Sequence, residues 1–114
     1  MKIWLDDQID NPEYPDRQTP AGWVGVKTAL QACRLLRTGK VSHVSFDHDL
    51  GEGTNGPLMS GYIVAKFIEY GAYRHSRGMK YGIPYLSWDV HSSNPVGREN
   101  IKRSMLHAQR LWMF

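Results

Sequence analysis

Short apolar segments alternate with amphipathic segments along this chain of 114 residues, and this order limits the possible folds more than any other feature. The segments typical of strands cover residues 2–5, 22–27, 41–46 and 85–90. The segments with helical periodicity cover residues 28–38, about 60–70 and 95 to the end of the chain. Such alternation favours a parallel sheet with helices on its faces. We therefore expect one α/β domain over residues 1–114, which is an ordinary domain length.

Local signals mark the ends of the helices and the loops between them. Thr28, with Gln31 three residues later, forms a capping box, and Asn94 before Pro95 is typical of a helix start. Three prolines exclude a regular helix from residues 8–21, and glycine-rich basic sequence predicts a loop over 71–83. The expected buried face of the first helix contains Leu30, Ala32, Cys33, Leu35 and Leu36.

Composition limits the partners and the compartment. The formal net charge is +3 and the pI is about 9.1, which favours an anionic partner. The single Cys33 excludes a disulfide within the chain and is typical of a reducing compartment. No apolar run approaches the roughly 18 residues of a membrane span, and Asp6 and Asp7 interrupt any signal-peptide pattern. We therefore expect a cytoplasmic protein with no membrane partner. We also expect no sequence-specific DNA binding, because basic and aromatic residues are not interleaved on a strand face.

Acidic residues directly follow two of the expected strands. Asp6 and Asp7 follow the first strand, and Asp47 and Asp49 follow the third. Because the carboxyl ends of parallel strands meet at one edge of a sheet, we expect these carboxylates to converge. Carboxylate oxygens suit a divalent metal, and Mg²⁺ binds one or two of them together with phosphate oxygens. The alternative is turn formation or helix capping, in which aspartate after a strand is common.

Two histidines also lie at strand exits. His48 follows Asp47, and His91 follows the fourth strand. Imidazoles that titrate near neutral pH act as general base and general acid across a phosphodiester. We therefore take His48, His91 and Asp47 as candidate catalytic residues, with a purely structural histidine as the alternative.

The start of the last helix carries candidate phosphate-binding residues. A helix N-terminus offers unpaired N–H groups and the positive end of a dipole. Ser92, Ser93 and Asn94 add side-chain donors there, and Arg98 lies one turn into the helix. The alternative for Asn94 is plain helix capping, which explains neither Arg98 nor His91.

Three segments together resemble the cyclic-phosphate processing receiver-like domains, diverged relatives of the response-regulator receiver: residues 2–7, 45–51 and 91–98. The resemblance implies a three-layer receiver-like (flavodoxin-like) fold with a mostly parallel sheet of four to five strands. The loop at 8–21 would replace the first receiver helix. The resemblance also makes Asp6 and Asp7 the acidic pair that binds magnesium in receivers, and Asp47 the equivalent of the phosphorylated aspartate. No Lys-Pro pair ends a final strand, which argues against phosphorelay signalling.

The resemblance implies an enzyme that acts on cyclic phosphates. Our first interpretation is a phosphoesterase whose substrate is a cyclic nucleotide or an RNA end with a 2′,3′-cyclic phosphate. A non-catalytic protein that sequesters such a ligand is the second interpretation. The third is a receiver module that accepts phosphate on Asp47, and the fourth is an α/β interaction protein without a ligand.

Overall fold

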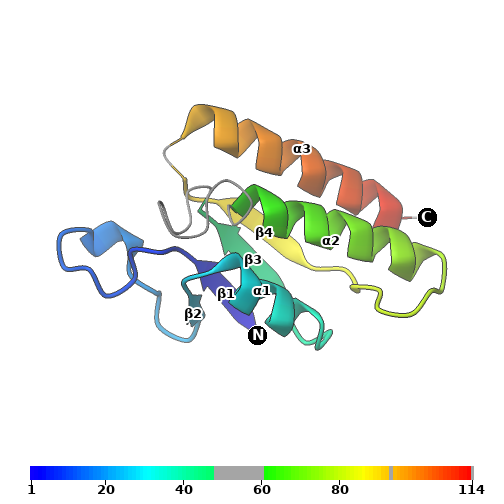
Figure 1. Cartoon of the computed structure of the whole chain (residues 1–114), viewed down its shortest axis with the longest axis horizontal. Coiled ribbons are helices and arrows are strands. Elements are labelled where there is room, and N and C mark those ends of the chain that lie inside the picture. Colours follow the sequence, from blue (N-terminus) through cyan, green and yellow to red (C-terminus); the bar gives the residue numbers. More distant parts are fainter. Residues whose placement is uncertain (48–60, 93, 114) are drawn as a thin grey trace.

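The computed structural model describes residues 1–47, 61–92 and 94–113, and it contains four strands and three α-helices in these ranges (Figure 1). The strands are β1 (Lys2–Leu5), β2 (Val24–Val26), β3 (His43–Phe46) and β4 (Ser87–Val90). The helices are α1 (Ala29–Leu36), α2 (Gly61–Ser76) and α3 (Pro95–Trp112), and a short 3₁₀ helix, η1, covers Pro15–Arg17.

The strands form one parallel sheet in the order β2-β1-β3-β4. Leu5 lies opposite Phe46, and Phe46 lies opposite Val90, so β1, β3 and β4 end at the same level. Backbone hydrogen bonds continue for one residue past each strand, because the N–H groups of Asp6, Asp47 and His91 bond to carbonyls of the neighbouring strands. The register therefore fixes these three residues side by side at the carboxyl edge of the sheet.

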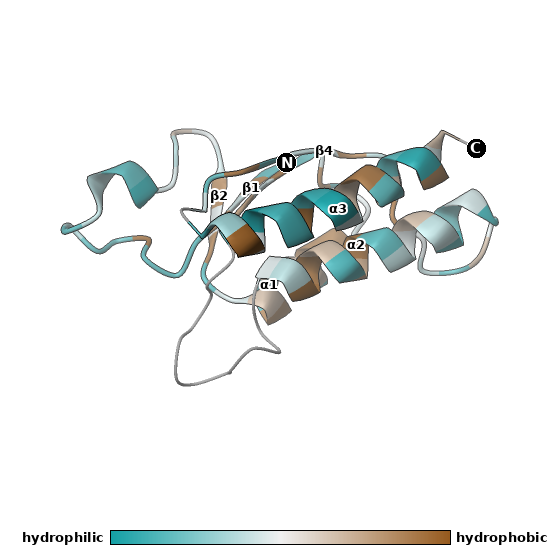
Figure 2. Cartoon of the chain, turned by 90° about the horizontal axis from the view of Figure 1, so that it is seen from above, coloured by the Kyte–Doolittle hydropathy of each residue, from teal (hydrophilic) through white to brown (hydrophobic). Residues whose placement is uncertain are grey.

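All three helices lie on one side of the sheet (Figure 2). The connections from β2 to β3 and from β3 to β4 run in the same direction across the sheet, so right-handed crossovers place α1 and α2 on the same face. Apolar side chains from the sheet and these helices form the core, including Ile3, Leu5, Val44, Phe46, Val64, Ile68, Ile101 and Met105.

The expected receiver-like α/β fold with a parallel sheet is confirmed. The described residues form a sheet layer and one helix layer, and no helix among them covers the second face of the sheet. The segment expected to replace the first receiver helix contains η1 and no α-helix, as its prolines require.

Several boundaries differ from those expected from the sequence. Helix α2 continues to Ser76, so the first six residues of the expected loop at 71–83 are helical. The helical periodicity continues through Ile68 and Ala72, which are both fully buried, and it outweighs the local glycine signal. Strands β3 and β4 begin two residues later than expected, and β2 covers only Val24–Val26 of the expected range 22–27.

Helix α1 is rotated relative to the expected face. Ala29, Ala32 and Leu36 are buried, whereas the side chain of Leu30 is 51% exposed and Cys33 is half-buried. The prediction that Leu30 lies in the core is wrong, because the buried face of α1 runs through Ala29, Ala32 and Leu36. Both expected caps form, since Thr28 Oγ1 accepts from the Gln31 amide (3.2 Å) and Asn94 Oδ1 accepts from the Gly97 amide (3.0 Å).

The segment between α2 and β4 packs tightly against the end of α2. A Cβ added to Gly82 would lie 2.7 Å from the backbone N and Cα of His75, which cannot move without distorting the helix. We expect Gly82→Ala to lower the free energy of unfolding by about 1–3 kcal/mol in urea denaturation. Gly71→Ala is the matched comparison. Its new Cβ would lie 2.4 Å from two side-chain carbons of Ile83 and 2.9 Å from Ile83 Cβ, so the segment that carries Ile83 must shift. We expect it to cost less, because that segment is not helical backbone and alanine favours the helix over glycine. An equal or larger loss in Gly71→Ala would contradict this packing argument.

Candidate functional site

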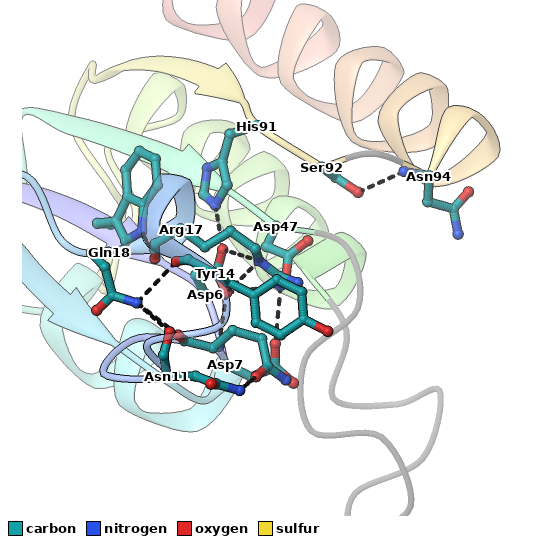
Figure 3. A network of polar contacts seen from close by, with 12 residues as sticks. Asp6, Asp7, Asn11, Tyr14, Arg17, Gln18, Asp47, His91, Ser92 and Asn94 are labelled. Carbon is teal, nitrogen blue, oxygen red and sulfur yellow. Dashed lines mark hydrogen bonds and ion pairs between the residues drawn. The ribbon is translucent and has the colours of Figure 1, made fainter.

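Three carboxylates meet at the carboxyl edge of the sheet, where β1 and β3 end (Figure 3). Asp6 and Asp7 follow β1, and Asp47 follows β3. One oxygen from each carboxylate lies within 4.8 Å of the others. Asp6 is fully buried and Asp47 is 4% exposed, so these charges are held away from water. This cluster of oxygen ligands, which suits a hard cation, could hold a metal ion.

The guanidinium group of Arg17 lies among the three carboxylates. Its Nε donates to both oxygens of Asp6, at 3.1 and 2.9 Å. Its Nη2 lies 3.2 Å from Asp7 Oδ1 and 2.5 Å from Asp47 Oδ2. One planar cation therefore bridges all three acidic side chains, so a metal ion would have to share or replace its contacts.

Contacts within the loop hold Arg17 in this place. The indole Nε1 of Trp4 donates to the Arg17 carbonyl at 3.0 Å, which ties η1 to β1. Gln18 Nε2 donates to the carbonyls of Asn11 (2.8 Å) and Tyr14 (3.0 Å), and the Tyr14 ring lies 5.3 Å from the Arg17 Cζ atom. The Arg17 side chain thus remains 27% exposed at the rim of the site, although its guanidinium bridges a largely buried cluster.

Arg17 was not among the residues predicted for the site. Residues 8–21 were expected only to form a loop, because no periodicity shows where a proline-rich segment passes over a sheet. One signal was present, since Arg17 is the only basic residue between Lys2 and Lys27 and this stretch contains five acidic residues.

His91 connects the acidic cluster to the sheet face that the helices leave uncovered. Its Nε2 lies 2.9 Å from Asp6 Oδ2, and its Nδ1 lies 2.8 Å from Ser45 Oγ. The imidazole also stacks on the Trp4 ring, with 3.9 Å between centroids and 5° between planes. Both ring nitrogens are therefore engaged, and in this arrangement His91 orients Asp6. Its assignment as a catalytic residue stays a prediction.

The hydrogen-bond chain continues across the uncovered face. Ser45 Oγ donates to Asp89 Oδ1, and Asp89 Oδ2 lies 3.1 Å from His43 Nε2. His43 Nδ1 in turn contacts Ser87 Oγ at 2.6 Å. These side chains occupy alternate positions of β3 and β4, which explains why they share one face. Ser45 is 1% exposed, so its contact with His91 does not make it an accessible nucleophile.

The environment gives the carboxyl groups opposite pKa shifts. Burial raises the pKa of Asp47 to about 6, and the nearby charge of Asp6 adds to this rise against the opposing effect of Arg17. Burial also acts to raise the pKa of Asp6, but hydrogen bonds from His91, Arg17 and the Gln8 amide outweigh it and lower that pKa. The hydrogen bond to Asp6 raises the pKa of Arg17, which therefore stays charged. At neutral pH Asp47 is the more basic carboxylate of the pair.

The pKa of Asp47 predicts a pH-dependent cost in stability. The ordinary pKa of Asp47 is 3.8 and its pKa in the folded protein is about 6. At pH values above the folded pKa, keeping Asp47 charged in the folded protein therefore lowers the free energy of unfolding by about 3 kcal/mol. At pH values below the ordinary pKa this cost is absent, so stability is lost as the pH rises through about 6. Asp47→Asn lacks this titration, while its amide oxygen can still accept from Arg17.

We therefore expect the difference in the free energy of unfolding between Asp47→Asn and the unaltered protein to change in favour of Asp47→Asn as the pH rises from about 4 to about 7. Urea denaturation of both proteins at each pH measures this difference. This window lies above the range in which Asp6, whose pKa is lowered, titrates. A constant difference across the window would contradict the raised pKa of Asp47.

The candidate phosphate-binding residues serve local structure in the described part of the chain. Ser92 is 3% exposed, and its Oγ accepts from the Asn94 amide at 3.1 Å. Asn94 caps α3, so the capping alternative holds for it. Arg98 is exposed on α3 beside Lys102, and both line a surface hollow with Pro95 and Glu99. Their role in phosphate binding stays a prediction.

The structure brings together four of the residues singled out from the sequence: Asp6, Asp7, Asp47 and His91. His48, Asp49 and Ser93 lie outside the described residues. Among the helices that the structure describes, none has the length and apolar character needed to cross a bilayer.

Comparison with known proteins assigns the chain to a family. The sequence model of the cyclic-phosphate processing receiver domain matches residues 1–107. No curated protein and no solved structure gave a match. The family match covers all the described strands and both edges of the sheet, including the acidic cluster after β1 and β3. The chain therefore belongs to the cyclic-phosphate processing receiver domain family.

Proposed function

We propose that this protein is a phosphoesterase that opens a cyclic phosphate by adding water. The substrate would be a cyclic nucleotide or an RNA end with a 2′,3′-cyclic phosphate. The observation that carries the proposal is the pairing of Asp47, whose pKa is raised to about 6, with the Arg17 guanidinium in a family named for cyclic-phosphate processing. A carboxylate of that basicity is suited to accept a proton near neutral pH.

The charges of the cluster support a role for a divalent cation. Three carboxylates face one guanidinium, so a phosphate anion would meet an excess of negative charge. Asp6 and Asp7, the acidic pair after β1, would hold Mg²⁺ and leave Asp47 free to accept a proton; the bound ion would supply positive charge for the phosphate oxygens. The planar fork of Arg17, released in part from the carboxylates, would then bind a phosphate oxygen at the rim of the site.

The chain's own residues would then handle the protons. Asp47 takes a proton from the attacking water, whose oxygen forms a bond to phosphorus while the ring P–O bond breaks. The released oxygen takes up a proton, and His48, the residue after Asp47, is our candidate donor. Exchange with solvent restores both groups. His91 would act as a positioning residue that keeps Asp6 ionised and oriented.

The test is to incubate the protein with 2′,3′-cyclic and 3′,5′-cyclic nucleotides, cyclic dinucleotides and a short RNA with a cyclic phosphate end. Each is tested with Mg²⁺ and with a chelator, and products are separated by chromatography. We expect one class to be converted to a phosphomonoester. Tight binding of a ligand that is recovered intact would overturn the proposal in favour of sequestration. Labelling by acetyl phosphate that disappears in Asp47→Asn, without turnover, would instead favour a phosphoaccepting receiver.

A further inference from the structure

A second surface, at the opposite edge of the sheet, has the composition of an anion-binding platform. Between Glu69 and Asp89 the sequence has no acidic residue, but it has four tyrosines together with Arg74, Arg77 and Lys80. The segment covers the end of α2 and the connection to β4, whereas the carboxylates lie at the other end of the strands. This segment therefore has three positive charges and no negative one, and it lies away from the candidate active site.

Basic and aromatic side chains are paired on the exposed side of α2. The Arg74 Cζ atom lies 4.7 Å from the centre of the Tyr70 ring, and its Nη2 donates to the Tyr70 hydroxyl at 2.9 Å. The Arg77 Cζ atom lies 5.2 Å from the centre of the Tyr73 ring, and Arg77 directly follows the last residue of α2. The two tyrosine rings are 56% and 39% exposed. Neither arginine forms an ion pair with a carboxylate among the described residues, so both guanidinium groups keep donors for an external anion.

A pocket beside these pairs joins them to α1. It has a volume of about 140 Å³ and is lined by Arg37, Phe67, Tyr70, Gly71, Arg74, Tyr81 and Ile83. Two guanidinium groups line it, none of its described lining residues is acidic, and Arg37 lies 6.0 Å from the Phe67 ring. This arrangement suits a phosphate held between two arginines above an aromatic floor.

Tyr81 is held outward at the mouth of this pocket. Its ring is 80% exposed, and its backbone φ of 64° lies in the left-handed region, which tyrosine rarely adopts. The Ile83 amide bonds to the Gly71 carbonyl at 2.9 Å, and Gly82 packs on the His75 backbone, so the neighbouring residues fix this strained conformation. A strained backbone that presents a large aromatic ring to water is typical of a binding position.

We propose that this surface, which we call the tyrosine–arginine platform (Tyr70, Tyr73, Arg74, Arg77 and Tyr81), binds single-stranded nucleic acid. Exposed aromatic rings provide stacking surfaces for bases, and arginines that face no carboxylate bind the phosphates between them. An acidic peptide would use the charges but leave the three exposed tyrosines of the platform without a role. The proposal does not depend on the proposed function, because it requires neither a cyclic phosphate nor the carboxylate cluster.

The experiment measures fluorescence anisotropy of a labelled single-stranded oligouridylate of about twelve nucleotides that ends in an ordinary 3′-hydroxyl. We expect binding that weakens with added salt. Tyr81→Ala and Arg74→Ala should each weaken it by about 5- to 100-fold, the range expected for losing one stacked base. Tyr81→Phe keeps the ring and should bind as the unaltered protein does.

Arg103→Ala is the matched charge control, because Arg103 is an exposed arginine on α3. We expect it to change the affinity less than twofold, and Asp47→Asn to leave the affinity intact. Circular dichroism and melting would show that Tyr81→Ala and Arg74→Ala are folded. The proposal is overturned if the oligonucleotide does not bind, if Arg103→Ala weakens it as much as Arg74→Ala, or if polyglutamate competes as well as RNA.

Discussion

Asp47→Asn is expected to lower the rate of cyclic-phosphate hydrolysis by about 10²- to 10⁴-fold, the usual contribution of a positioned general base. The amide keeps the size of the side chain and can still accept the hydrogen bond from Arg17 Nη2, but it cannot take a proton. Because this change should also stabilise the protein near neutral pH, lost activity cannot be attributed to unfolding. The measurement is kcat on whichever cyclic substrate the panel identifies, with urea denaturation in parallel.

Asp10→Asn is the control for this change. Asp10 undergoes the same chemical substitution, but its side chain is 77% exposed, and among the described residues its ion pair is with Lys27 at 3.4 Å. Its φ of 74° is also well tolerated by asparagine. We expect full activity in this variant. If Asp10→Asn and Asp47→Asn lost activity equally, the loss would not come from the site.

The pH profile gives a second test of the same role. A general base works only when ionised, so kcat/KM should rise with pH through about 6, the folded pKa of Asp47. Asp47→Asn should remove this rise from its residual rate. A rate that falls over the same range would mean that a protonated Asp47 acts as the acid, which reverses the proposed direction of proton transfer.

Periodicity and strand order predicted the part of the site that the sheet itself positions. Asp6, Asp47 and His91 each follow a strand directly, and parallel pairing places such residues at one edge whatever the loops do. The end of α2 was predicted too early in the sequence, because Gly71 is a poor helix former in isolation. In the folded chain Gly71 lies inside the helix and leaves space for the Ile83 side chain. Local preference and tertiary packing conflict there, and packing decides.

Arg17 shows what such patterns cannot predict. Its position depends on the path of a proline-rich loop, which is fixed by single contacts such as the bond from Trp4 Nε1 and those made by Gln18. None of these contacts leaves a repeat in the sequence. The uncovered sheet face was also missed, because a helix layer was expected there by resemblance. The polar chain from His43 to His91 occupies that face instead.

Arg17→Met is expected to lower the free energy of unfolding by about 3–5 kcal/mol, the cost of leaving a buried charge without its partner. Asp6 is fully buried and would keep only His91 and a backbone amide, while Asp47 and Asp7 would repel it without the bridging cation. Methionine retains most of the side-chain volume, so the loss reports charge and hydrogen bonds. Arg34→Met, an exposed arginine on α1, should cost less than about 0.5 kcal/mol.

Mg²⁺ distinguishes a cation site from a purely structural ion cluster. If the carboxylates hold a divalent cation in competition with Arg17, Mg²⁺ should raise the melting temperature of Arg17→Met more than that of the unaltered protein, because ligand binding to the folded state stabilises it. Isothermal titration should show tighter Mg²⁺ binding in the variant for the same reason. A loss of stability that Mg²⁺ does not reduce would mean that the guanidinium is the only cation that this cluster accepts. In that case Arg17 itself would supply the positive charge for a bound phosphate.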